Sequence, residues 1–260
     1  MQLKAVHLSS QLKLDTYPYN LPLIKSFHSL SFEKPVTILV GENGTGKSTF
    51  LEALASSADM ILISGKTLDK KFEHAKELGN KMKLVWTVKS KNGFFFRADD
   101  FINYIRETSQ TKKEAMEKIN EIHERSPFSL EVMPYARTVS DLNHFYGDGL
   151  ENRSHGESFL DLFKARFRPN GLYILDEPEA PLSPMKQIAL ISLIIDMVKE
   201  GAQFIIATHS PILMAIPNAD LLLLDNGFFE KTEFDDLEHV RLTKLFLENP
   251  ERFLRYFQDE

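Results

Sequence analysis

The chain has 260 residues, of which 43% are apolar, so it can bury one large core or two small ones. Its formal charge of −6 argues against a surface wrapped broadly in nucleic acid, and the absence of cysteine excludes disulfides and thiolate metal sites. No apolar run approaches the roughly 18 residues of a membrane span, and the N-terminal residues lack a secretion signal. We therefore expect a cytoplasmic protein without a membrane span.

The first third of the chain predicts strands that lead into a glycine-rich turn. Residues 3–8 alternate like a strand, and a Pro- and Tyr-rich run follows that is typical of a loop. F-H-S-L-S-F and V-T-I-L-V are two further strand-like runs, and the second enters G-E-N-G-T-G-K-S-T-F-L-E-A-L-A, a turn that opens into a helix. Apolar runs on both sides of Asn92-Gly93 predict a β-hairpin.

The middle of the chain is charged and interrupts this pattern. Ala115, Ile119 and Ile122 fall near one face of a short amphipathic helix, whereas residues 126–153 look irregular. Neither edge of the charged stretch carries a clean linker. We expect a single domain, in which residues 1–65 and 154–260 form the core and residues 66–153 form an inserted lobe.

Helices and buried strands alternate in the last third. A helix after Ser158 leads to the strand of L-Y-I-L-D-E-P, and a second helix leads to the strand of Q-F-I-I-A-T-H-S-P. L-L-L-L-D-N-G-F-F-E predicts a terminal hairpin, and the residues after it predict two short helices. This order indicates an α/β fold with a mainly parallel central sheet.

The glycine-rich turn matches G-x-x-x-x-G-K-[ST] in full, between a strand and a helix as the motif requires. In this motif the backbone N–H groups surround phosphates, the lysine reaches the β/γ oxygens and the hydroxyl binds Mg²⁺. We therefore expect ATP and Mg²⁺, with Lys47 in a catalytic role and Ser48 as a metal ligand; the alternative is a glycine-rich turn with a chance lysine. The expected nucleotide-binding residues here are Gly41, Glu42, Asn43, Gly44, Thr45, Gly46, Lys47, Ser48 and Thr49.

Three more polar residues follow apolar strands. Asp176 and Glu177 come where ligands bind in open α/β sheets, and we expect Asp176 to hold Mg²⁺ through water and Glu177 to act as general base on the attacking water. His209 follows another buried strand, where a neutral imidazole can sense a γ-phosphate and help to hold that water. The alternatives are a solvated strand end for the two acids and a structural role for the histidine.

Together these motifs resemble the ATP-binding-cassette (ABC) ATPase superfamily. The resemblance is greatest to its soluble branch, which includes chromosome-maintenance and recombination-repair ATPases, and to compact stand-alone predicted ATPases with S-H-G-E-S-F, L-D-E-P-E-A and A-T-H-S-P. N-P-E-R-F-L near the C-terminus also fits, so nearly the whole chain is covered. The resemblance implies a P-loop NTPase fold with an antiparallel β subdomain, a helical lobe, and hydrolysis of ATP to ADP and phosphate.

The family also has a signature loop, written L-S-G-G-Q or L-S-G-G-E, that contacts the γ-phosphate of ATP bound to the other subunit. S-H-G-E-S stands at that place, about 14 residues before the strand that ends at Asp176. The resemblance implies that Ser154, His155, Gly156 and Glu157 complete the nucleotide site of a second copy in an ATP-dependent head-to-tail homodimer. A simple helix cap is the alternative, because Ser154 and Glu157 have capping-box spacing.

Several positions depart from the family pattern. Arg153 stands where the family prefers Leu, His155 replaces a glycine, and Ser183 replaces the aspartate that usually makes a contact across the subunits. Gln110 is the candidate for the glutamine that reports magnesium occupancy to the lobe. The candidates for an aromatic ring that stacks on adenine are Tyr17, Tyr19 and Phe27.

The favoured function is a stand-alone ATPase switch, in which ATP joins two chains, hydrolysis parts them and the lobe acts on an unidentified protein partner. One alternative is the nucleotide-binding subunit of an ABC transporter, although the signature ends in Glu-Ser rather than Gln. Another is a DNA repair or chromosome-associated ATPase, because residues 66–91 hold eight lysines against three acids, a candidate DNA-binding patch. A module with purely structural nucleotide, and a phosphate-transferring kinase, are the remaining alternatives.

Overall fold

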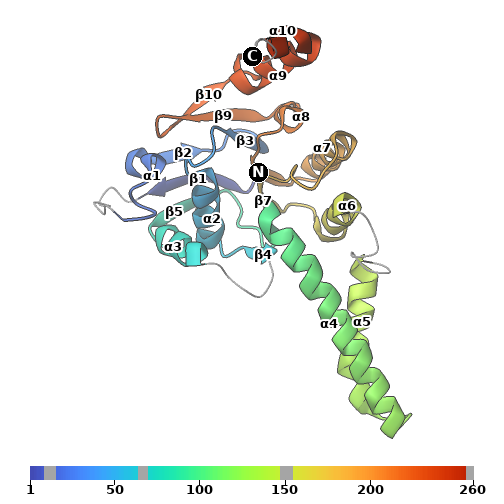
Figure 1. Ribbon diagram of the computed structural model, residues 1–260. Coiled ribbons are helices and arrows are strands. Elements are labelled where there is room, and N and C mark those ends of the chain that lie inside the picture. The colour runs from blue at the N-terminus through green and yellow to red at the C-terminus, as the bar shows by residue number, and fades with distance from the viewer. Residues whose placement is uncertain (9–15, 64–69, 147–154, 256–260) are drawn as a thin grey trace.

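The computed structural model describes residues 1–8, 16–63, 70–146 and 155–255. In this part of the chain, a seven-stranded sheet has the order β10-β9-β3-β8-β7-β6-β4, and only β10 runs antiparallel to its neighbour (Figure 1). Its strands are β3 (Val36–Val40), β4 (Ile61–Ile63), β6 (Gly93–Arg97), β7 (Leu172–Asp176), β8 (Gln203–Ala207), β9 (Asp220–Asp225) and β10 (Phe228–Thr232). The expected α/β fold with a mainly parallel central sheet is confirmed.

A second, three-stranded sheet is antiparallel and lies beside the first. Its central strand β1 (Leu3–Leu8) pairs with β2 (Ser29–Ser31) and β5 (Met82–Trp86). The fully buried Gln203 joins the two sheets, because its side chain accepts hydrogen bonds from the N–H groups of Gln2 and Leu3 and donates one to the Leu3 carbonyl. This sheet is the antiparallel β subdomain that the resemblance implied.

Helices cover both faces of the seven-stranded sheet. One face packs against α2 (Lys47–Ser57), with α1 (Pro22–Ser26) and α3 (Lys70–Gly79) nearby, and the other against α6 (His155–Arg166) and α7 (Pro184–Lys199). The short α8 (Pro211–Met214) precedes β9, and α9 (Glu238–Glu248) and α10 (Pro250–Leu254) form the predicted C-terminal pair. Successive side chains of a buried strand point to opposite faces, so Phe94 and Phe96 join the α6–α7 core whereas Phe95 joins the α2 core.

A helical hairpin extends away from both sheets. It is made of α4 (Ala98–Arg125) and α5 (Met133–Tyr146), joined through a short 3₁₀ turn at Leu130–Val132 (Figure 1). The amphipathic helix expected around Ala115 and Ile122 exists, and both residues are buried, but it is far longer than expected. The expectation of irregular structure over residues 126–153 was wrong for residues 133–146, since α5 is a 14-residue helix that packs on α4. Residues 147–153 lie outside the described residues.

The predicted hairpin at Asn92-Gly93 was also wrong. Strand β5 belongs to the three-stranded sheet and β6 to the seven-stranded one, so the two strands do not pair. Gly93 is needed for a different reason: its φ is +135°, and a Cβ there would lie 1.9 Å from the Leu172 carbonyl oxygen. The glycine therefore allows β6 to lie tightly against β7, whereas Asn226-Gly227 does form the predicted hairpin of β9 and β10.

The segment 66–153, expected to form an inserted lobe, contains elements of three kinds. β5 and β6 are strands of the two sheets, α3 packs on α2, and the α4–α5 hairpin is the part that extends outward. The division into core and lobe therefore stays a prediction. Within the described residues, every helix is too short or too polar to cross a membrane.

We predict that Phe163→Ala lowers the free energy of unfolding by about 3–5 kcal/mol, because it removes a fully buried ring from a packed cluster. Its ring centroid lies 4.4 Å from that of Phe159 and 5.2 Å from that of Phe96. The matched control is Phe128→Ala at the tip of the hairpin, where 96% exposure of Phe128 predicts a change within about 0.5 kcal/mol. Denaturant unfolding measures the free energy of unfolding of both variants. Equal changes in the two would contradict the buried, packed position of Phe163.

Candidate functional site

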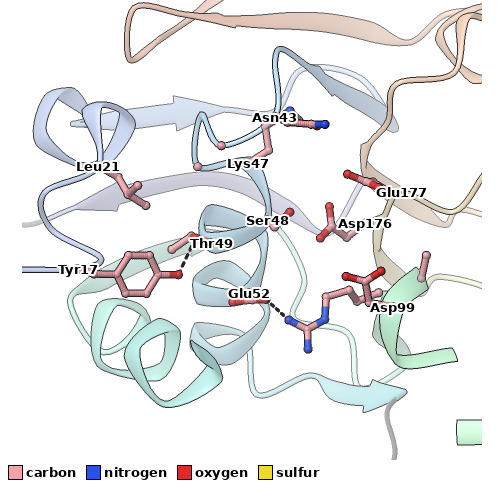
Figure 2. A pocket seen from close by; sticks show the side chains of 14 residues that line it. Tyr17, Leu21, Asn43, Lys47, Ser48, Thr49, Glu52, Asp99, Asp176 and Glu177 are labelled. Atoms are coloured by element: carbon pink, nitrogen blue, oxygen red, sulfur yellow. Dashed lines mark hydrogen bonds and ion pairs between the residues drawn. The ribbon is translucent and has the colours of Figure 1, made fainter. Parts of the chain in front are cut away.

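The carboxyl ends of β3 and β7 and the start of α2 enclose a pocket of about 360 Å³. Figure 2 shows the loop before α2 on one side of it and the end of β7 on the other. The pocket also reaches the start of α4, on the far side from Tyr17 and Leu21. The predicted site residues that line it are Asn43, Gly44, Gly46, Lys47, Ser48, Thr49, Asp176 and Glu177.

The loop between β3 and α2 is shaped by its glycines. Gly44 and Gly46 have φ values of +79° and +104°, which other residues rarely adopt, and they turn the chain so that α2 begins at Lys47. The Lys47 ammonium donates to the carbonyl oxygens of Gly41 and Glu42 at 2.6 and 2.7 Å. Burial lowers the pKa of Lys47, and nearby carboxylates, Asp176 first, oppose that shift.

Asp176 lies at the end of β7, beside the first turn of α2 (Figure 2). Only 3% of the residue is exposed, and burial raises the pKa of its carboxyl group to about 7; the Ser48 hydroxyl acts against this shift, and Glu177 and Glu52 add to it. Lys47 and Ser48 thus face a carboxyl group whose negative charge is costly without a cation. An oxygen-ligand pair of this kind suits Mg²⁺.

Glu177 and His209 form the adjoining part of the site. Glu177 has a φ of +49°, a sparsely populated conformation for a residue with a side chain, and its N–H donates to the Ala207 carbonyl of β8. Its carboxylate, 46% exposed, lies 3.8 Å from His209 Nε2. Burial lowers the pKa of His209, with Lys47 acting in the same direction, so the neutral imidazole is favoured.

Glu179, which was not predicted from the sequence, holds the segment after β8. Its carboxylate accepts the backbone N–H of His209 at 2.7 Å, and burial raises the pKa of Glu179. Ser210, the residue after His209, caps α8, and its hydroxyl donates a hydrogen bond to the Gln187 side chain at 2.5 Å. A third acid in L-D-E-P-E was the available signal for this role.

Unpartnered buried atoms gather at this site. Among the described residues, five buried side-chain polar atoms lack a hydrogen-bond partner, and three of them are Asp176 Oδ1, Glu179 Oε2 and His209 Nε2. Buried polar atoms are nearly always satisfied, so such a concentration marks a place built for a polar ligand. The residues present therefore fit a magnesium ion and a phosphate group.

Two family models match the regions that carry this site. One, described as "AAA domain", matches residues 22–58 and includes the glycine-rich loop; the other, described as "AAA domain, putative AbiEii toxin, Type IV TA system", matches residues 158–215 and includes Asp176, Glu177 and His209. The chain is also 26% identical to the cobalt import ATP-binding protein CbiO of Salmonella typhimurium over 196 residues, 73% of this chain and 67% of CbiO. Together these matches support the resemblance to ABC-type P-loop ATPases.

Two further comparisons extend over more of the chain. A Pyrococcus furiosus protein named "Putative ABC transporter ATP-binding protein" is 26% identical over 243 residues, 90% of this chain and 86% of its own. The solved Smc head domain from the same organism, bound to the C-terminal domain of ScpA, is 13% identical over 96% of this chain and 100% of its own, with a TM-score of 0.49. This chain spans about two thirds of the length of CbiO.

The structure also places several residues whose roles the family pattern left open. Tyr17 lines the pocket with its hydroxyl 3.0 Å from Thr49 Oγ1, whereas Tyr19 and Phe27 are buried in the α2 core. Tyr17 is therefore the aromatic candidate beside the pocket. Gln110 lies on the exposed side of α4 and donates to Glu114, away from the residues that line the pocket.

The signature region is described only in part. Ser154 lies outside the described residues, and α6 begins at His155, so the backbones of Gly156 and Glu157 are helical. Phe159 and Phe163, further along α6, anchor this helix on the seven-stranded sheet. The roles of Ser154, His155, Gly156 and Glu157 therefore stay predictions.

Arg97, the last residue of β6, lines the pocket and was not predicted from the sequence. Its guanidinium bonds Glu52 of α2 at 2.5 Å and Asp100 of α4 at 2.9 and 3.0 Å. The three side chains are between 4% and 16% exposed, so this is a buried ionic cluster. R-A-D-D after an apolar strand indicated a local ion pair between the arginine and an acid. The pairing with Glu52 was not predictable, because Glu52 is distant in sequence.

We predict that Arg97→Gln lowers the free energy of unfolding by about 3 kcal/mol, because it leaves the Glu52 carboxylate buried without its guanidinium partner. The control is Lys199→Gln, which breaks an ion pair with Asp196 whose side chains are 70% and 62% exposed, for a change within about 0.5 kcal/mol. Denaturant unfolding of the two variants tests this, and similar small values would show that the cluster is not a stabilising one.

Proposed function

We propose that this ABC-type ATPase binds MgATP and hydrolyses it to ADP and phosphate as a dimer of two head-to-tail chains. The observation that carries the proposal is the set of unpartnered buried atoms of Asp176, Glu179 and His209 beside the glycine-rich loop. A cation at Asp176 and a terminal phosphate near His209 would satisfy the atoms of these two residues. The family relationship supports ATP as the nucleotide.

Each residue of the site suits one part of the reaction. The N–H groups of the loop and Lys47 would hold the phosphates, and Ser48 and Asp176 would hold Mg²⁺, which supplies positive charge to the phosphate oxygens when bound. Glu177, partly exposed at the pocket, would accept a proton from the attacking water. A neutral His209 can accept or donate a hydrogen bond at Nε2, and so could hold that water or the terminal phosphate.

The position of α6 and the signature motif support the proposed dimer. The pocket is bounded by the P-loop, the end of β7 and the start of α4, whereas α6, which begins at His155, packs on the other face of the sheet. Ser154, His155, Gly156 and Glu157 would therefore act on the nucleotide of a second copy rather than on their own. ATP would favour the closed pair through the contacts that it makes only there.

We predict that Glu177→Gln keeps ATP binding but lowers kcat by about 10²- to 10⁴-fold, because the amide cannot accept the proton of the attacking water. Phosphate release and binding of a fluorescent ATP analogue measure the two effects. Lys47→Ala is the matched control, which should lose ATP binding itself. An unchanged kcat in Glu177→Gln would refute the general-base role and favour a structural nucleotide.

We also predict that MgATP shifts the solution mass of the Glu177→Gln chain from 29.8 kDa to about 60 kDa, since slow hydrolysis traps the closed pair. Multi-angle light scattering measures this mass. Ser154→Arg should abolish the shift by placing a bulky side chain in the signature. A chain that binds ATP and stays at the monomer mass would refute the homodimer and would indicate that a different protein completes the site.

The curated relatives favour a second candidate function. Several are named as ATP-binding proteins of import or transport systems, so this chain could drive a membrane transporter as its nucleotide-binding subunit. The partner would then supply the membrane-crossing part. DNA is a further candidate partner, because Lys81, Lys83 and Lys89 of the basic segment are exposed.

A further inference from the structure

The turn of the α4–α5 hairpin presents apolar side chains to solvent. Phe128, Leu130 and Met133 lie within six residues of one another, and each of the three is more than half exposed. Figure 1 shows this end of the hairpin extending away from both sheets. Exposed apolar side chains that gather at one place mark an interaction surface, whereas single ones need no explanation. We call these three residues the hairpin tip.

An apolar groove lies between α9 and α10, at the opposite end of the molecule from the hairpin tip (Figure 1). Leu237 and Val240 anchor the start of α9 in the core on the α6–α7 side, whereas the second half of α9 is exposed. The groove has a volume of about 400 Å³, and the ring centroids of Phe246 and Phe253 lie 5.7 Å apart in its wall. The residues that line this α9–α10 groove are Leu242, Thr243, Phe246, Leu247, Phe253 and Leu254.

The hairpin tip and the α9–α10 groove complement each other in shape and in charge. The tip is a protruding aromatic ring with aliphatic neighbours, and the groove is an apolar hollow large enough to hold the ring of Phe128. An aromatic side chain that fills an apolar pocket is a common anchor of a protein interface. Residues 124–133 around the tip hold two acids and one arginine, whereas residues 241–255 around the groove hold four basic residues and two acids. Opposite net charges favour a tip meeting a groove and disfavour two tips or two grooves meeting each other.

We propose that the hairpin tip of one chain docks in the α9–α10 groove of a second copy. The two surfaces lie at opposite ends of the chain, so a tip does not fill the groove of its own chain. The contact is heterologous: each bound chain still offers one free surface, and further copies add to a ring or a filament. A contact made by one turn and one groove is small, so we expect a dissociation constant on the order of 10⁻⁴ M. The proposal does not depend on nucleotide.

Sedimentation velocity of the nucleotide-free chain tests the contact at about 5 µM and about 500 µM, on either side of that constant. We expect the parent to sediment as a 29.8 kDa monomer at the lower concentration and as larger species at the higher one. Phe128→Glu and Leu247→Glu each place a charge on one of the two surfaces, and each variant should stay monomeric at both concentrations. Both positions are exposed, at 96% and 70%, so circular dichroism should show the parent's folded state in the two variants. The matched control is Met185→Glu on α7, 73% exposed, which should associate as the parent does.

The decisive measurement mixes the two variants in equal amounts at the higher concentration. The Phe128→Glu chain keeps an intact groove, and the Leu247→Glu chain keeps an intact tip. One contact can therefore form between the two variants, although neither can form it with its own kind. We expect the mixture to contain dimers and no larger species, because the remaining tip and the remaining groove of each dimer are the altered ones.

Several results would overturn the tip-to-groove contact. A parent that stays monomeric at the higher concentration would do so, and would leave the groove for a different protein. Loss of association in only one of the two variants would indicate contacts between two tips or two grooves. A mixture that stays monomeric, or a Met185→Glu control that no longer associates, would also contradict the contact. None of these results bears on ATP hydrolysis, because all the samples lack nucleotide.

Discussion

The cost of burying two carboxylates beside one loop governs the arrangement of the site. Asp176 and Glu52 are each 3% exposed, and a charge removed from water must be neutralised or paired. Arg97 pairs Glu52 directly, whereas the carboxyl of Asp176 has a pKa raised to about 7 and one oxygen without a partner among the described residues. The fold thus carries its own cation for Glu52, whereas the proposed Mg²⁺ would neutralise Asp176.

Aromatic packing connects three elements that border the proposed nucleotide site or carry the signature, namely β6, α4 and α6. Phe96 of β6, Phe101 of α4 and Phe159 of α6 form a mutual cluster, with ring centroids 4.9 to 5.8 Å apart. The strand that ends at the pocket, the base of the hairpin and the helix that follows the signature therefore share one fully buried aromatic contact. Closely packed interiors transmit small displacements, so a change at the nucleotide need not stay local.

Features that depend on short local patterns were predictable from the sequence. The glycine-rich loop, the buried strands with polar ends, and the hairpin at Asn226-Gly227 follow from signals within a few residues, and the structure has all three. Long-range choices were not predictable in this way: β5 and β6 flank an ideal turn pair yet join different sheets, and α5 is helical because α4 offers it a partner. The Arg97–Glu52 pair spans 45 positions, so only the fold could bring it together.

The direct passage from β6 into α4 has a geometrical consequence. A helix of 28 residues is about 42 Å long, so a tilt of roughly 10° at its base would displace its far end by about 7 Å. The far end carries Phe128 and Leu130, which are 96% and 81% exposed. A small change in direction where α4 leaves the sheet would thus move this exposed apolar end by about the width of an aromatic side chain.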